Sequence, residues 1–235
     1  MKPLKAFLTL FSIVVIIAYL HFEESLTASG IVVAVILYCL SYAVHLLAHE
    51  CGHLIGGKIS GYKLLRLQLG PVNIVRNQKG KLSLKWKSQL SGQCIMVPKK
   101  TESVRFKAYN LGGAMANINV SVLSLALLPF DSFYSTLLFI ELLLIGIQKS
   151  LVNLIPHKSN SVPNDGYIVG LLNHNEVIQG DYAVYLTLYA KLLSGEEINI
   201  EEYTYERIMA GDDEMLYYNE IQNILKELSL LGKSS

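Results

Sequence analysis

The 235-residue chain contains few charged residues and few cysteines. Charged side chains make up 17% of the sequence and hydrophobic residues 51%, a balance too apolar for an ordinary soluble domain. The net charge of +1 excludes a strongly basic nucleic-acid binder, so we expect no nucleic-acid partner. The three cysteines, an odd number at no recognisable spacing, exclude a disulfide framework and a thiolate metal cluster. The composition therefore predicts an integral membrane protein.

Long apolar runs occur in four places, at residues 6–22, 25–48, 108–130 and 132–148. Each reaches the ~17 residues that a membrane-crossing helix needs at least. Within these runs only Glu141 is charged. No cleavage site of small residues follows the first run, so we expect that run to remain as a membrane anchor. The pattern predicts an all-α membrane protein with about four transmembrane helices.

The basic residues indicate the orientation of these spans. Twelve Lys and Arg residues lie between Lys58 and Lys107, and the only acid among them is Glu102. Because Lys and Arg near membrane spans are retained in the cytoplasm, we expect this loop to be cytoplasmic. The sequence thus predicts a multi-pass protein, with the lipid bilayer as its surroundings and both termini in the cytoplasm. We take the membrane to be that of a bacterial cell.

Two segments outside the spans have their own patterns. The loop at residues 58–106 alternates apolar and polar residues at 65–69 and 82–86, which predicts a small antiparallel β-sheet beside the membrane. From residue 178 onward the chain is acidic, and its apolar positions recur at helical spacing. We therefore divide the chain into an N-terminal anchor (1–24), a core that includes the β-rich loop (25–177) and a short acidic helical tail in the cytosol (178–235).

The second apolar run ends in His49-Glu50-Cys51-Gly52-His53, an HExxH pattern. Residues four apart lie on one face of a helix, so the two imidazoles can bind one metal ion and Glu50 can act as a general base beside it. The other interpretation is that both histidines only hydrogen-bond neighbouring helices. Ionisable groups at the end of a membrane helix favour a functional site. His45, one turn earlier, is either a further ligand or a polar contact within the bundle.

These residues resemble the site-2 protease family of intramembrane zinc metalloproteases. Its signature combines HExxH with a distant Asn-x-x-Pro…Asp-Gly motif, which this chain matches with Asn153 to Pro156 and with Asp165-Gly166. A Gly-x-x-x-Asn element between the two motifs is matched by Gly113 and Asn117, although Ala114 stands where the family often has Pro. The resemblance implies a Zn²⁺ ion held by His49, His53 and Asp165. It also implies hydrolysis of a peptide bond within or next to the membrane, with Glu50 as general base and Asn117 and Asn153 near the substrate or its oxyanion.

One departure from the family pattern concerns the third ligand. Residues 157–164 separate the two parts of the distant motif, which are usually only a few residues apart, and His157 in this insert is the alternative ligand. The chain also has no room for a peptide-binding module between spans. Its substrate is accordingly expected to be a membrane-bound protein or a short precursor peptide. A catalytically inactive binding relative and a His-lined ion transporter are the competing functions.

Overall fold

The computed structural model describes residues 2–76, 80–99, 105–128, 132–159, 162–173, 175–194, 198–203 and 215–232. Its internal contacts group the chain into two compact units. The first unit comprises residues 1–53 and 110–167, and the second comprises residues 54–109 and 168–235. The borders predicted at residues 24 and 177 remain predictions.

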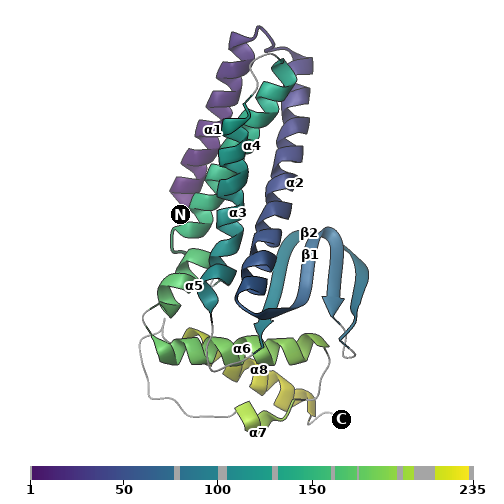
Figure 1. The fold of residues 1–235 in the computed structure, drawn as a ribbon, viewed down its shortest axis with the longest axis vertical. Coiled ribbons are helices and arrows are strands. Elements are labelled where there is room, and N and C mark those ends of the chain that lie inside the picture. The colour runs from purple at the N-terminus through teal and green to yellow at the C-terminus, as the bar shows by residue number, and fades with distance from the viewer. Residues whose placement is uncertain are drawn as a thin grey trace. The chain divides into compact units, whose positions relative to one another are not determined.

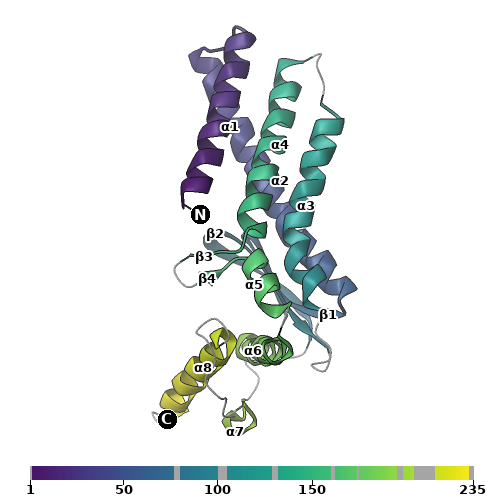
Figure 2. The same ribbon diagram turned by 90° about the vertical axis from the view of Figure 1, so that its left-hand side faces the viewer.

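Four long helices form the first unit, and they run side by side in both views (Figures 1 and 2). They are α1 (Lys2–Phe22), α2 (Ala28–Ile59, as far as His53), α3 (Phe106–Ala126, from Asn110) and α4 (Phe133–Leu154). Helix α1 packs against α4, where the ring of Tyr19 stacks on that of Phe133 with the centroids 5.7 Å apart.

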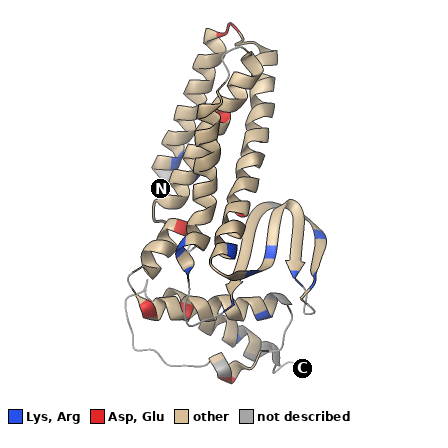
Figure 3. Cartoon of the chain, viewed as in Figure 1, with Lys and Arg blue, Asp and Glu red and all other residues tan. Residues whose placement is uncertain are grey.

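The outer surfaces of these helices are apolar. Large hydrophobic side chains such as Val32 and Ile36 on α2 are more than half exposed, and Figure 3 shows few charged residues along the helices. Among the described residues, three helices are long and apolar enough to cross a membrane, namely α1, α2 and α4. This finding supports a membrane protein, but it does not confirm a fourth span. Helix α3 is less apolar because it carries several buried polar residues, which are Asn110, Asn117, Ser121 and Ser124.

After α4 the first unit continues with a short hairpin and the start of a helix. Strand β3 (Lys158–Ser159) pairs antiparallel with β4 (Val162–Pro163), and α5 (Asp165–Leu172) follows at once. This segment carries the predicted third ligand.

The second unit contains a long two-stranded hairpin. Strand β1 (Tyr62–Arg76) pairs antiparallel with β2 (Leu82–Pro98), which confirms the predicted antiparallel sheet, with strands that are longer than the alternating segments. Strand β1 passes through Gly70 and Pro71 without ending. The register shifts at this point, so Pro71 has no partner in the ladder and its missing N–H costs no hydrogen bond.

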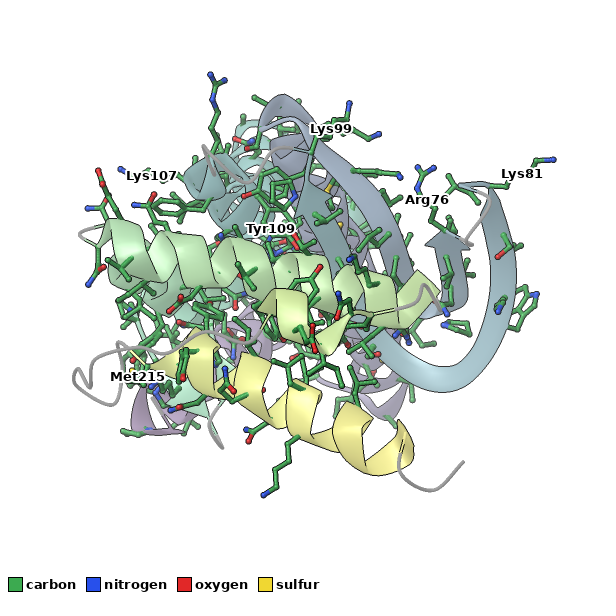
Figure 4. All side chains as sticks on the ribbon, turned by 90° about the horizontal axis from the view of Figure 1, so that it is seen from below. Arg76, Lys81, Lys99, Lys107, Tyr109 and Met215 are labelled. Atoms are coloured by element: carbon green, nitrogen blue, oxygen red, sulfur yellow. The ribbon has the colours of Figure 1, made fainter. Side chains whose placement is uncertain are left out.

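The helical tail covers this hairpin. Helices α6 (Glu176–Ser194), α7 (Ile200–Tyr203) and α8 (Leu216–Gly232) confirm the prediction of a helical C-terminal region. Tyr182 and Tyr217, whose ring centroids are 4.8 Å apart, are buried in one cluster with Tyr62 and Met96 of the hairpin. Figure 4 shows Lys81 and Lys99 pointing away from the same unit. The second unit thus has a largely apolar and aromatic interior, with Gln68, Asn73 and Asp181 as buried polar residues, and carries lysines at its surface.

Candidate metal centre

Helix α2 brings two imidazoles together. His49 and His53 are one turn apart, and their Nε2 atoms are 3.1 Å from each other. The rings are nearly perpendicular, with an angle of 86° and centroids 4.6 Å apart. Two ring nitrogens at this separation point to a common position beside the helix.

Asp165, the first residue of α5, completes the group. Its Oδ2 atom lies 3.6 Å from Nε2 of His49 and 3.5 Å from Nε2 of His53. Ligands about 2.0–2.1 Å from a tetrahedral metal ion are roughly 3.3 Å from one another. The three donor atoms have this spacing, and together they could hold a metal ion.

The three side chains of this group are mostly buried but not completely enclosed. The side chains of His49, His53 and Asp165 are 15%, 10% and 18% exposed, so none of them is completely buried. Glu50 follows His49 on α2 and is 5% exposed. Three protein ligands leave one position of a tetrahedral ion for water, which is the arrangement of catalytic rather than structural zinc sites.

The long insert before Asp165 folds back on itself. The backbone N–H of Asn164 donates to the carbonyl of His157 at 2.9 Å, and the N–H of His157 donates to Oδ1 of Asn164 at 3.0 Å. The Asn164 amide also donates to the carbonyls of Val152 and Ile155, both at 2.7 Å. These bonds close the insert into a loop, so Asp165 starts its helix beside the end of α4.

Asn164 is a site-supporting residue that the sequence motifs did not reveal. Its Oδ1 accepts the N–H of Tyr167 at 2.9 Å, which makes it the N-cap of the helix that begins at Asp165. The sequence contains one indication of this role. An Asn directly before Asp-Gly at the start of an apolar run is typical of a helix N-terminus.

Two glycines allow the elements of this site to approach closely. A Cβ at Gly113 of α3 would lie 2.5 Å from Cε1 of His49 and 2.5 Å from Nε2 of His53. A Cβ at Gly166 would collide with the carbonyl oxygen of Leu154 at the end of α4. Only glycine has no Cβ, so each position permits a contact that any other residue would prevent.

A row of polar side chains connects His49 to the interior of the bundle. The amide of Asn117 lies between Nδ1 of His49, at 3.2 Å, and Nδ1 of His45, at 3.1 Å. Nε2 of His45 donates in turn to the carbonyl of Leu142 on α4, at 2.7 Å. His45 and Asn117 are both fully buried. His45 is therefore a polar contact of the bundle, and the metal-binding group within the described residues does not include it.

Proton positions along this row decide whether His49 can bind a metal. In the structure the amide oxygen of Asn117 faces His45 and its NH2 group faces His49, so Nδ1 of His49 accepts and a neutral His49 carries its proton on Nε2. If the amide turns over, Asn117 donates to a neutral His45 and accepts from Nδ1–H of His49. Nε2 of His49 then has a free lone pair for a metal. The amide of Asn117 and the backbone of Gly113 both hydrogen-bond the ring of His49, so Asn117 is one of two groups that bear on its tautomer.

The remaining predicted residues lie near the group without joining it. Asn153 is half-buried in the last turn of α4, and its backbone oxygen is 2.9 Å from the position of a Cβ at Gly166. His157, the alternative ligand, is not part of the metal-binding group found among the described residues.

Comparisons with known proteins add nothing to this geometry. No protein-family model, curated protein or solved structure matches the chain.

Proposed function

We propose that this chain is an intramembrane zinc metalloprotease. One observation carries the proposal, namely that Nε2 of His49, Nε2 of His53 and Oδ2 of Asp165 lie 3.1–3.6 Å from one another. Two imidazoles and one carboxylate are a ligand set typical of catalytic zinc. Zinc bound there would supply a Lewis acid that lowers the pKa of a bound water and polarises a carbonyl.

The side chains around the ligands have defined roles in this proposal. Glu50 takes a proton from the attacking water and passes it to the leaving amine. With its amide flipped so that the oxygen accepts Nδ1–H of His49, Asn117 would favour the tautomer of His49 that can bind metal, and the loop closed by Asn164 positions Asp165. Asn117 and Asn153 are the candidates for contacts with the substrate.

The substrate is proposed to be a membrane-bound protein or a short precursor peptide. A helix in a bilayer satisfies all of its backbone hydrogen bonds internally, so the substrate must be locally unwound before hydrolysis. The side chains of the three ligands are partly exposed, which is consistent with access of the water that the reaction needs.

We also propose that α3 is the fourth span. Its polar residues are buried, while Val122, Leu123 and Leu125 are more than half exposed, which fits a helix with an apolar surface toward lipid. With four spans and a basic loop on the cytoplasmic side, we propose that both termini lie in the cytoplasm, here of a bacterial cell.

The decisive experiment compares cells that express the wild type with cells that express Glu50→Gln. Newly formed N-termini of membrane proteins and small peptides are identified by mass spectrometry. Wild-type-specific cleavage near membrane segments, absent with Glu50→Gln although this variant retains zinc, supports the proposal. Identical N-termini in both cultures, with zinc bound in both purified proteins, contradict proteolysis and favour a binding role.

A matched pair of variants tests the ligands. Asp165→Ala is expected to lose the zinc measured in the purified protein, whereas His157→Ala is expected to keep about one ion per chain. The opposite result would make His157 the third ligand.

A further inference from the structure

A second feature of the first unit is a cavity that lies apart from the three donor atoms. Its volume is about 640 Å³, which is within the range of small-molecule binding sites. Residues of α1, α2 and α4 line it, and almost all of its surface is apolar. The polar exceptions include Thr9, Ser12, Gln148 and Glu141.

Glu141 is the exceptional residue of this lining. It is 0% exposed, and among the described residues neither of its carboxyl oxygens has a hydrogen-bond partner. It lies eight residues after Phe133, or about 12 Å along α4, well within the span. An unpaired carboxyl group in an apolar membrane interior is costly, so such groups mark functional sites.

Three other polar side chains of the lining, those of Ser12, Thr9 and Gln148, already have hydrogen-bond partners. The hydroxyl of Ser12 donates to the carbonyl of Leu8 at 2.9 Å, and the amide of Gln148 donates to the hydroxyl of Thr9 at 2.8 Å. Among the described residues, the two carboxyl oxygens of Glu141 are therefore acceptors of the lining that still lack a hydrogen-bond donor. No Lys or Arg is among the lining residues.

The rim of the cavity is accessible from lipid. Ile17 on α1 is 48% exposed and Val35 on α2 is 57% exposed, although both line the cavity. In a bilayer these side chains would contact acyl chains, so a ligand would enter sideways from the membrane.

We propose that this cavity binds an aliphatic ammonium compound, with the hydrocarbon chain against the apolar walls and the ammonium group on Glu141. A primary ammonium group has three donors and can serve both carboxyl oxygens, and its charge strengthens each bond. An alcohol has one donor, and a fatty acid would bring a second carboxyl group. This site is independent of the proposed zinc chemistry.

The test uses the full chain in nanodiscs of phosphatidylcholine, a lipid without a primary amine. Dicyclohexylcarbodiimide, which adds to carboxyl groups in apolar surroundings, is applied with increasing dodecylamine, dodecanol or dodecanoate. Total modification of residue 141, the carbodiimide adduct together with any amide or ester formed from the activated carboxyl group, is measured by mass spectrometry. Dodecylamine is expected to protect Glu141 at concentrations at least about tenfold lower than the other two compounds. Glu141→Gln is the control for the position of the adduct, and exposed Glu23 is the reference carboxyl group.

A cavity-filling variant provides the second measurement. Ala34 lines the cavity and is 6% exposed, so Ala34→Phe is expected to abolish protection by dodecylamine. Equal protection by all three compounds, no protection by dodecylamine, or an unreactive Glu141 in folded wild-type protein would each overturn the proposal. If Ala34→Phe fails to fold, the comparison of the three compounds on the wild type still tests the proposed ammonium site.

Discussion

The two units of this chain differ in the balance of polar and apolar residues that they bury. The first unit buries polar groups such as His45, Asn117 and Glu141 beneath an apolar outer surface. The second unit buries Tyr62, Met96 and other apolar or aromatic side chains beneath a charged surface. A lipid environment gives no energetic reason to bury apolar groups, so small and polar residues hold membrane helices together. The comparison shows that buried polar residues form the site in one unit, whereas apolar burial provides the stability of the other.

The largest effect is expected from removing a ligand of the first unit. His53→Ala leaves two donor atoms, which is too few for a zinc ion bound by three protein side chains. We expect loss of stoichiometric zinc in metal analysis of the purified protein and loss of any zinc-dependent cleavage. The helical content measured by circular dichroism should not change, because the second unit has its own core. Zinc retained at one ion per chain would contradict the assignment.

The second unit should respond to loss of apolar volume instead. Ile221 is fully buried in a cluster with Leu188, Tyr203 and Leu225. Ile221→Ala should lower the free energy of unfolding of this unit by about 2–5 kcal/mol, while zinc content stays the same. Ile59, 71% exposed, is the control, and Ile59→Ala should cost less than about 0.5 kcal/mol in the same denaturation experiment. Similar losses for both variants would show that Ile221 is not in a packed core.

Substitution of Asn117 tests the row of polar side chains. Asn117→Ala removes the partner of Nδ1 of His49, and loss of such a supporting hydrogen bond typically weakens metal binding about 10–100-fold. Competition with a chelator measures the change. Asn119 on the same helix is exposed, so Asn119→Ala should leave the affinity unchanged. Equal affinities of all three proteins would refute the positioning role of Asn117.

Two helix caps allow the units to be compared directly. Asn164 caps α5, and Asn175 accepts the N–H groups of Val177 and Ile178 at the start of α6. Replacement of either by Ala should cost about 0.5–2 kcal/mol of stability. Only Asn164→Ala should also weaken zinc binding, because only Asn164 closes the loop before Asp165. Weaker zinc binding in Asn175→Ala would show that this distinction is false.

The smallest effect at neutral pH is expected for Tyr62→Phe. The hydroxyl of Tyr62 is buried and has no partner among the described residues, so its removal should not destabilise the protein. Burial raises the pKa of Tyr62 above its ordinary value of 10.0. The unfolded chain therefore ionises first, and stability should fall as the pH rises above about 10. Tyr62→Phe should reduce this alkaline loss, measured as the denaturation midpoint against pH, and an unchanged pH profile would contradict the inference.

Local patterns in the sequence predicted much of this arrangement. The apolar runs predicted α1, α2 and α4, and the i to i+4 spacing predicted that His49 and His53 share one face. Alternation predicted strands in the basic loop, and β1 continues through Gly70 and Pro71 by a shift in register. These features depend on residues close together in the chain, so periodicity alone indicates them.

The sequence by itself thus determined the long apolar helices, the pair of imidazoles and the chemical types of the candidate ligands. The tertiary structure alone decided that Asp165 reaches the imidazoles despite its long insert, that Asn117 connects His45 to His49, and that the C-terminal helices share a core with the hairpin. Each of these contacts joins residues more than 60 positions apart in the chain. No periodic pattern encodes such pairs, because they depend on how packed helices meet and which glycines let them approach.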